Sequence, residues 1–215
     1  TLGDVWRYDT SSDVWMRISP DASSATNSWF GYGGLAVDAQ NPNTVMVAAL
    51  NQWWPDAQIW RSTDAGATWT PIWHWGAYPE RVLHYEHDIS ASPWLTFNGT
   101  PSLPEIAPKL GWMIGDLDID PFDSNRMMYG TGATIYGSDN LTAWDAGGPI
   151  NISVKAQGLE ETSVQDLISP PQGAPLFSAL GDLGGFRHDD LSIVPNKMFD
   201  NPTMSFHMGT DVSTI

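Results

Sequence analysis

The sequence predicts an all-β fold, and three observations support this prediction. Helical periodicity is almost absent from the 215 residues, because short apolar or alternating runs are interrupted by clusters of Gly, Pro, Asn, Asp and Ser. Several segments repeat one another, and each contains strand-like runs around a turn. One of these turns, at residues 62–69, has a distinctive Asp-containing motif. Together these features indicate a series of similar antiparallel sheets.

Two interleaved repeats define the unit of this fold. Residues 5–18 (VWRYDTSSDVWMRI) align with 59–72 (IWRSTDAGATWTPI) at an offset of 54 residues, and 135–145 (IYGSDNLTAWD) form a weaker third copy. Residues 33–50 resemble 115–132, and both contain a strand, an Asn-Pro or Asp-Pro turn and a second strand. The unit therefore has about four strands, which is typical of a β-propeller blade. At about 50 residues per blade, we expect about four blades and hence a piece of a longer protein.

The turn STDAGATW at residues 62–69 matches the Asp-box, S-x-D-x-G-x-x-W, of sialidase-type propellers. We expect Asp64 to accept backbone N–H bonds inside the turn, as short polar side chains do. Gly66 is expected to supply a positive φ, and Trp69 to pack between blades. With Ser62, these residues are predicted to stabilise a turn and not to form an active site.

Composition excludes several classes of partner. The net charge of −16, from 9 basic and 25 acidic residues, disfavours binding to nucleic acid or to an anionic membrane surface. The chain has no apolar run long enough to span a membrane and no cysteine for a disulfide or thiolate site. Twelve tryptophans are more than a core of this size needs, and exposed indoles stack on the apolar faces of sugars. A neutral ligand such as a polysaccharide would not be repelled by this charge. We also expect a monomeric protein.

The stretch SALGDLGGFRHDD, residues 178–190, places Asp182 among glycines. The residues alone slightly favour a turn role for Asp182, and the alternative is a catalytic acid beside glycines that leave room for a bulky substrate. Gly184 and Gly185 are the glycines that follow Asp182. Asp189 and Asp190 are expected to be solvated turn acids.

His188 is a further candidate in this stretch, although a structural role is the commoner one for a lone histidine. If the strand continues through this residue, we expect Phe186 and His188 to alternate, one facing the core and the other a cleft or a neighbouring blade. A supporting role near Asp182 is the functional alternative for His188.

Aromatic residues outside the repeats are candidates for substrate stacking. Trp53 and Trp54 would point to opposite faces of a strand, whereas both could be exposed in a loop before Pro55, and core packing is the alternative. Trp112 and Trp94 are weaker candidates, and both belong to the Pro- and aromatic-rich region around residues 74–111. An insertion of this kind between repeats normally has a function.

Two polar clusters resemble metal sites only in part. The sequence HYEHD at residues 84–88 lacks the H-E-x-x-H spacing, so a polar loop cluster is favoured over a zinc site. Residues 116–125 begin like a calcium loop, but Pro121 stands where glycine is required and Met127 where glutamate is required. As a strand, this segment places Leu117 and Ile119 on one face and its aspartates on the other. We therefore expect no metal site.

Long segments of the chain resemble glycoside hydrolase family 74, the xyloglucan-specific endo-β-1,4-glucanases, which are often secreted fungal enzymes. These segments are NQWWPDAQIWRSTDAGATWTPIW, DISASPWLTF, PKLGWM, IDPFDSNRMMYGTGATIYGSDNLTAWD, GLEETSVQDLISPP and ALGDLGGFRHDDL, which together cover nearly the whole chain. The resemblance implies a tandem pair of seven-bladed β-propellers with a cleft between them. Residues 1–148 would form later blades of the first propeller and 149–215 the start of the second. The implied reaction is hydrolysis of the xyloglucan backbone with inversion, without a cofactor.

The resemblance also implies roles for individual residues. The family uses two catalytic aspartates, and its G-D-x-G-G-F motif falls on residues 181–186, so Asp182 is expected to be the general acid. The T-D-x-G-G motif of its partner is absent from this chain, which leaves open that the chain alone is inactive. Substrate-stacking aromatics are implied around Trp53 and Trp54. The family and three N-x-S/T sequons, at Asn98, Asn140 and Asn151, predict a secreted, extracellular glycoprotein.

Three alternatives stay open at this stage. The chain is also compatible with a reducing-end-specific oligoxyloglucan hydrolase or a general endoglucanase, since loops around the cleft separate these activities. A non-catalytic propeller that binds glycans or proteins is the alternative from another class. The Asp182 motif argues against that last alternative.

Overall fold

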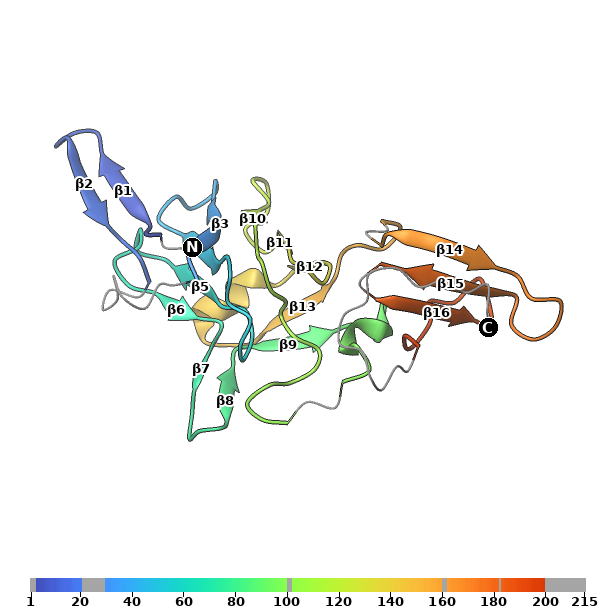
Figure 1. The fold of residues 1–215 in the computed structure, drawn as a ribbon. Helices are drawn as coiled ribbons and strands as arrows, with labels where there is room; N and C mark the ends of the chain where they lie inside the picture. Colours follow the sequence, from blue (N-terminus) through green and yellow to red (C-terminus); the bar gives the residue numbers. More distant parts are fainter. Residues whose placement is uncertain (1–2, 21–29, 100–101, 160–161, 182, 200–215) are drawn as a thin grey trace. The chain divides into compact units, whose positions relative to one another are not determined.

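The computed structural model describes residues 3–20, 30–99, 102–159, 162–181 and 183–199, which form short strands and two 3₁₀ helices (Figure 1). This confirms the predicted all-β class. The chain divides into two compact units, one made of residues 1–88 and 102–155 and the other of 89–101 and 156–215.

The first unit contains four sheets among its described residues, and two of these match the predicted four-stranded blade. The smaller sheets are the hairpin of β1 (Trp6–Asp9) and β2 (Val14–Arg17) and the hairpin of β7 (Trp73–Trp75) and β8 (Arg81–Leu83). The first blade-like sheet has the order β3 (Tyr32–Val37), β4 (Val45–Ala49), β5 (Ile59–Ser62), β6 (Thr70–Pro71). The second has the order β10 (Asp116–Ile119), β11 (Met127–Gly130), β12 (Ile135–Ser138), β13 (Ile150–Val154), β9 (Tyr85–Asp88).

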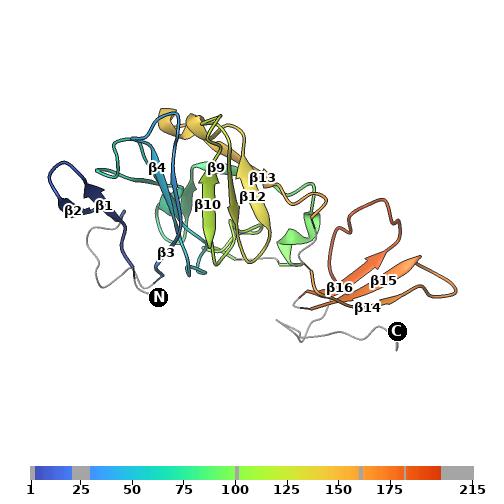
Figure 2. The same ribbon diagram turned by 90° about the horizontal axis from the view of Figure 1, so that it is seen from above.

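The core of the first unit lies where these two sheets meet. Every residue of β4 is buried, and β10 alternates, with Leu117 and Ile119 buried while Asp116 and Asp118 are exposed, as predicted. Strand β3 packs beside β10, and Figure 2 shows the two strands together in the interior of this unit. A Cβ atom at Gly34 would lie 2.7 Å from the Cβ of Leu117, so only glycine allows this approach.

Strand β9 was not predicted. It comes from the insertion between the repeats and pairs in parallel with β13, which adds a fifth strand to the second blade-like sheet. From its sequence, the segment HYEHD is expected to form only a polar loop cluster. The correction has a physical reason, since residues 84–88 have no apolar alternation and gain strand structure from the free edge of β13.

The Asp-box is a compact hydrogen-bonded turn between β5 and β6. The Ser62 hydroxyl donates to Asp64 at 2.8 Å, and the backbone N–H of Thr68 donates to the same carboxylate at 2.8 Å. Gly66 has a φ of +84°, and its N–H donates to the Ser62 hydroxyl. The indole N–H of Trp69 donates to the Ile18 carbonyl next to β2 at 2.7 Å, which links adjacent sheets.

The third repeat preserves this turn with different residues. Ser138 donates to Asn140 Oδ1 at 3.0 Å, as Ser62 does to Asp64, and the following residues form the 3₁₀ helix η2 (Leu141–Ala146). Asn140 also accepts a bond from the Asn151 N–H at 2.7 Å. The asparagine of this sequon is therefore part of the turn, and glycosylation stays a prediction.

The second unit contains one described antiparallel sheet and one 3₁₀ helix. The sheet has the order β14 (Val164–Ile168), β15 (Leu176–Leu180), β16 (Gly184–His188). The helix η1 (Pro93–Thr96) comes from residues 89–101, which group with this unit. Its Trp94 contacts Phe186 of β16, with ring centroids 5.6 Å apart.

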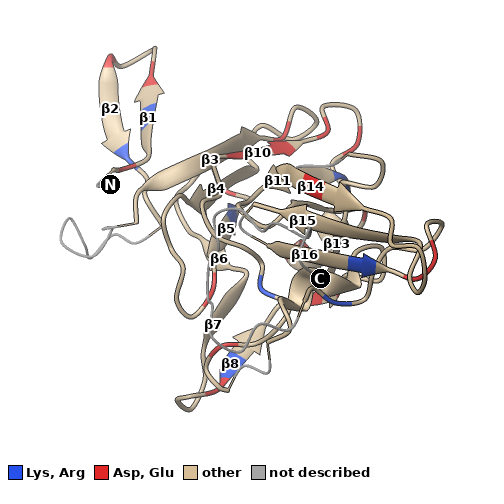
Figure 3. Cartoon of the chain, turned by 45° about the vertical axis from the view of Figure 1, so that its right-hand side comes forward, with Lys and Arg blue, Asp and Glu red and all other residues tan. Residues whose placement is uncertain are grey.

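The boundary between the units differs from the expected division after residue 148. Residues 150–154 form β13, which pairs with β12 and β9, so hydrogen bonding keeps them in the first unit up to Lys155. The assignment of the two units to two propellers stays a prediction. Acidic residues are spread over the loops and strand ends of the described chain, while basic residues are sparse (Figure 3).

Candidate functional site

Five aromatic side chains of the first unit form two groups of ring contacts. We use the name aromatic face for the two groups together, and its members are Trp53, Trp54, Trp75, Tyr78 and Trp112. Trp53 is 44% exposed and Trp54 is 52% exposed, and both lie in the loop between β4 and β5. Trp53 and Trp54 are therefore exposed in a loop and do not point to opposite faces of a strand. Trp75 and Tyr78 are also exposed, at 42% and 71%.

The members of the aromatic face contact one another in two groups. Trp53 stacks on Trp112, with ring centroids 6.2 Å apart and ring planes at 24°. Trp54 contacts Trp75 at 6.1 Å, and Trp75 contacts Tyr78 at 5.6 Å. Exposed indoles in mutual contact have fixed orientations, because each ring restricts the rotamers of its neighbour. The result is a pre-oriented apolar surface that suits the flat faces of a neutral sugar chain.

Trp75 and Tyr78 were not singled out from the sequence. They lie in the sequence HWGAYP at the start of the aromatic-rich insertion, which was the available signal. Their contact with Trp54 depends on the β7–β8 hairpin, whose position no periodicity in the sequence predicts. Trp94, the other weak candidate, packs in the second unit against Phe186 and is not a member of the aromatic face.

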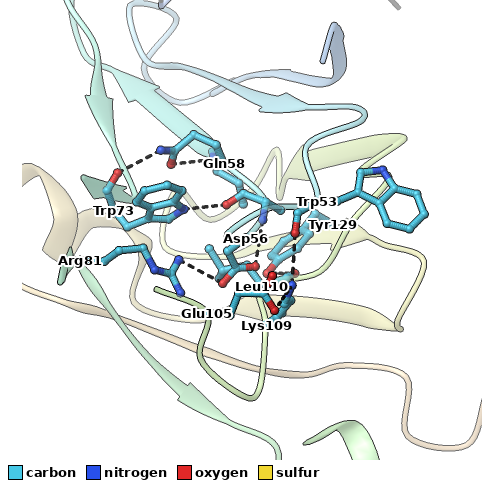
Figure 4. A network of polar contacts seen from close by, with 11 residues as sticks. Trp53, Asp56, Gln58, Trp73, Arg81, Glu105, Lys109, Leu110 and Tyr129 are labelled. Atoms are coloured by element: carbon cyan, nitrogen blue, oxygen red, sulfur yellow. Dashed lines mark hydrogen bonds and ion pairs between the residues drawn. The ribbon is translucent and has the colours of Figure 1, made fainter. Parts of the chain in front are cut away.

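A buried polar network includes residues of the loop that contains Trp53 and Trp54 (Figure 4). The Trp73 indole N–H donates to the Ala57 carbonyl at 2.7 Å, and the Gln58 amide donates to the Trp73 carbonyl at 3.0 Å. Arg81 Nη1 lies 3.4 Å from Asp56 Oδ2, and the guanidinium sits 4.8 Å from the centre of the Trp73 ring. These contacts join the loop that contains Trp53 and Trp54 to the β7–β8 hairpin.

Asp56 is the buried carboxylate of this network. Burial raises the pKa of Asp56 to about 6, although the positive charge of Arg81 acts in the opposite direction. Lys109 donates to the Trp53 carbonyl at 3.2 Å and forms an ion pair with Glu105 at 3.2 Å. A carboxylate that titrates near neutral pH in a loop with two exposed tryptophans marks a candidate functional site.

Asp182, the expected catalytic acid, lies outside the described residues. The flanking residues belong to the connection between β15 and β16 of the second unit, where the Gly181 N–H donates to the Ser163 carbonyl at 2.8 Å. A Cβ atom at Gly184 would meet no other atom within 4 Å, so there is open space beside that residue. Its φ of +77° also favours glycine.

Packing against the neighbouring strand requires glycine at position 185, which the sequence did not predict. A Cβ atom there would lie 1.9 Å from the Ser178 carbonyl oxygen, so glycine permits the close approach of β15. Its φ of +146° is a second reason for glycine. The space around Gly185 is therefore occupied by β15 backbone, whereas Gly184 retains open space.

The expectation that Phe186 and His188 face opposite sides is wrong. Their rings are in contact, with centroids 6.2 Å apart, because residues two positions apart on a strand point to the same face. His188 Nε2 lies 3.0 Å from the Ser178 hydroxyl. Phe186 is buried and His188 is half-buried, so the histidine lies at the margin of the same packed face.

The other polar clusters have structural explanations. His87 of β9 is half-buried against Tyr136, with ring centroids 4.6 Å apart, and burial lowers its pKa to about 4. Asp190 accepts bonds from the N–H and hydroxyl of Ser192, as expected for a turn acid. Among the described residues, no three His, Asp or Glu side chains are placed to hold a metal ion. The described part of the chain also has no helix that is long and apolar enough to cross a membrane.

No protein-family model matches the chain. The chain is 63% identical over 202 residues to a xyloglucanase of Paenibacillus sp, which covers 94% of this chain and 20% of that protein. It is 58% identical over 213 residues to Xyloglucanase Xgh74A of Acetivibrio thermocellus, which covers 99% of this chain and 25% of the relative. The chain thus spans about a quarter or less of the length of these relatives.

A solved structure gives the same result. The chain superposes on the GH74 xyloglucanase of Xanthomonas campestris with a TM-score of 0.76 and 32% identity, over 96% of this chain and 26% of that structure. The similarity to family 74 xyloglucanases and the predicted fold class are therefore confirmed over nearly the whole chain. The expected fungal type is not confirmed, because relatives from Paenibacillus sp and Acetivibrio thermocellus and one from Hypocrea jecorina, at 44% identity, all match nearly the whole chain.

Proposed function

We propose that this chain is a segment of a family 74 glycoside hydrolase and that the full-length protein hydrolyses the β-1,4-glucan backbone of xyloglucan. The observation that supports this proposal best is the aromatic face, a pre-oriented set of indoles suited to a neutral glucan. The net charge of −16 does not oppose such a ligand, since xyloglucan is uncharged. A polymer of this size does not enter cells, so we also propose an extracellular enzyme.

Asp182 is the proposed general acid. Inverting hydrolysis requires a protonated carboxyl group on the leaving oxygen and a carboxylate base about 6.5–9.5 Å away. The partner aspartate of the family pattern has no counterpart in this chain, so complete catalysis requires the remainder of the protein. The open space beside Gly184 is consistent with a sugar chain next to Asp182.

The test replaces Asp182 with Asn in the full-length protein and measures the release of reducing ends from xyloglucan. Because removal of the general acid eliminates proton transfer to the leaving oxygen, we expect a loss of about 10²–10⁴-fold in kcat. Asp189→Asn is the matched control, because Asp189 is an exposed aspartate of the same stretch that pairs with Arg187 at 2.7 Å. Near wild-type activity of Asp182→Asn would contradict the proposed role.

Product analysis separates the remaining alternatives. Internal cleavage of the polymer gives a rapid fall in viscosity, whereas reducing-end action on short oligosaccharides does not. Equal rates on xyloglucan and on unbranched β-glucan would indicate a general endoglucanase. Binding of xyloglucan by the full-length protein without release of reducing ends would indicate the non-catalytic propeller.

A further inference from the structure

Asp56 and Arg81 form a buried ion pair between the loop that contains Trp53 and Trp54 and the β7–β8 hairpin (Figure 4). The Asp56 side chain is fully buried and that of Arg81 is 2% exposed. Asp56 follows Trp54 by two residues, and Arg81 is the cross-strand partner of Trp75 in the β7–β8 hairpin. The ion pair therefore joins the backbones of the two segments whose tryptophans, Trp54 and Trp75, are in contact.

The chemistry of this pair is poorly suited to a purely stabilising role. Arg81 Nε and Nη2 are buried and have no hydrogen-bond partner in the described structure, and the separation of 3.4 Å is long for an ion pair. Burying two charges with incomplete hydrogen bonding costs more than packing two apolar side chains of similar volume. We explain this unfavourable pair by the geometry that it imposes on the loop between β4 and β5 and on the β7–β8 hairpin.

A second tether acts on the other group of the aromatic face. Lys109 donates to the backbone carbonyl of Trp53, and it lies three residues before Trp112, on which Trp53 stacks. Glu105 holds the Lys109 ammonium group at 3.2 Å. The two tryptophan–tryptophan contacts of the aromatic face that span two segments, Trp53–Trp112 and Trp54–Trp75, are thus each accompanied by a charged contact between the same segments.

We propose that the Asp56–Arg81 ion pair positions Trp54 and Trp75 of the aromatic face and so determines the affinity of this face for a glucan chain. Asp56 and Arg81 are positioning residues, since both side chains are buried and neither reaches the surface where the glucan would lie. The identity of the ligand rests on the proposed function. The positioning of the tryptophans does not, and it can be measured without any ligand.

The charge state of Asp56 makes the pair pH-dependent in a range that can be tested. The charged and titratable groups that influence Asp56 come from β8, from the segment 102–111, and from β9, β11 and β12: Arg81, Lys109 with its partner Glu105, Tyr85, Tyr129 and Tyr136. Burial raises the pKa of each of these tyrosines, so the three hydroxyls stay neutral throughout. With a pKa of about 6, Asp56 is ionised at about pH 7.5 and protonated at about pH 5.

The experiment uses Asp56→Asn in the full-length protein, because asparagine has the shape of the protonated aspartate but no charge. At about pH 7.5 we expect the KM for xyloglucan to rise about tenfold with kcat within twofold of wild type, as loosened tryptophans weaken binding without touching the reacting atoms. At about pH 5 the variant and the wild type are expected to have the same KM. In the absence of ligand, the circular dichroism band from coupled tryptophans should be weaker in the variant than in the wild type at about pH 7.5. At about pH 5 the bands of the two proteins should be equal.

Asp120→Asn is the matched control. Asp120 and Arg126 are also separated by 3.4 Å, but Arg126 is 59% exposed, so removal of this pair should change neither KM nor the circular dichroism. If Asp56→Asn does not fold, Arg81→Lys retains the charge but lacks the planar guanidinium over Trp73, and a raised KM with unchanged kcat is expected.

Two results would overturn the positioning role. One is that Asp56→Asn has the KM and the circular dichroism band of the wild type at the higher pH. The same result for Arg81→Lys would count equally if Asp56→Asn does not fold. The other is an equal penalty at both pH values, which would indicate a general structural role. Trp54→Ala separates the two proposals, because an unchanged KM in that variant contradicts glucan binding by the aromatic face while the ligand-free circular dichroism still tests Asp56.

Discussion

Replacing Arg61 with Met tests how neighbouring repeats are held together. Arg61 of β5 forms two hydrogen bonds with the Asp145 carboxylate of η2, from Nε at 2.7 Å and from Nη2 at 2.8 Å. Arg7 occupies the corresponding position in the first repeat, and its Nη1 donates to the Ala65 carbonyl of the Asp-box turn at 2.8 Å. The same residue type at the same repeat position thus reaches the next turn in both cases, but only Arg61 is buried.

The free energy that the Arg61–Asp145 pair contributes follows from the burial of the two side chains. The Arg61 side chain is 3% exposed and that of Asp145 is 35% exposed, so this pair lies between a surface and a fully buried ion pair. Two charge-assisted bonds are worth about 1.5–3 kcal/mol each, and partial solvation of Asp145 reduces their sum to about 2 kcal/mol. The exposed bond of Arg7 to a carbonyl should contribute about 0.5 kcal/mol.

Hydrogen–deuterium exchange in the full-length protein measures the free-energy contributions of the Arg61 and Arg7 hydrogen bonds at the turns that they contact. The Gly147 and Gly148 N–H groups bond to carbonyls of η2, so they report the opening of this helix. Arg61→Met should accelerate their exchange about 30-fold, and Arg7→Met should accelerate exchange in the 62–69 turn about twofold. Equal effects in the two variants would refute the reasoning, because the difference rests on the burial of Arg61 and on its two bonds to a carboxylate.

Two further predictions concern stability. Gly185→Ala should destabilise the protein by several kcal/mol more than Gly184→Ala, because its Cβ would lie 1.9 Å from the Ser178 carbonyl whereas that of Gly184 meets open space, and thermal unfolding of the two variants checks this order. Hydrogen bonds from threonine and serine lower the pKa of Asp64 to about 2, so its contribution to stability is present above its ordinary value of 3.8 and is lost as the pH falls toward 2. Asp64→Asn should therefore flatten the acid limb of the stability profile, and an unchanged limb would contradict this.

Local sequence patterns predicted the repeats, the Asp-box turn and the alternation of β10 correctly. The signals for the turn and for β10 are contained within a dozen residues, as with Leu117 and Ile119, which are buried on one face while the flanking aspartates are exposed. Residues 33–50 and 115–132 do form paired strands around a turn, namely β3–β4 and β10–β11. The similarity to family 74 was also evident from motifs alone.

Features that depend on contacts between distant segments were missed. Strand β9 forms on the free edge of β13, more than 60 residues later in the chain. Gly185 appeared to make room for a substrate, whereas its space is taken by the Ser178 carbonyl of the neighbouring strand. The error over Phe186 and His188 is of another kind, since the strand period of two by itself places both residues on one face.

The sequence by itself determined the fold class, the family relationship and the candidate acid Asp182, because repeats and motifs are properties of neighbouring residues. Only the tertiary structure decided that Trp53 stacks on Trp112 and that Trp54 contacts Trp75, which in turn contacts Tyr78. It alone revealed the buried Asp56–Arg81 pair, whose partners are 25 residues apart. The physical reason is that stacking and ion pairing act over a few ångströms in space, which packing of distant segments decides.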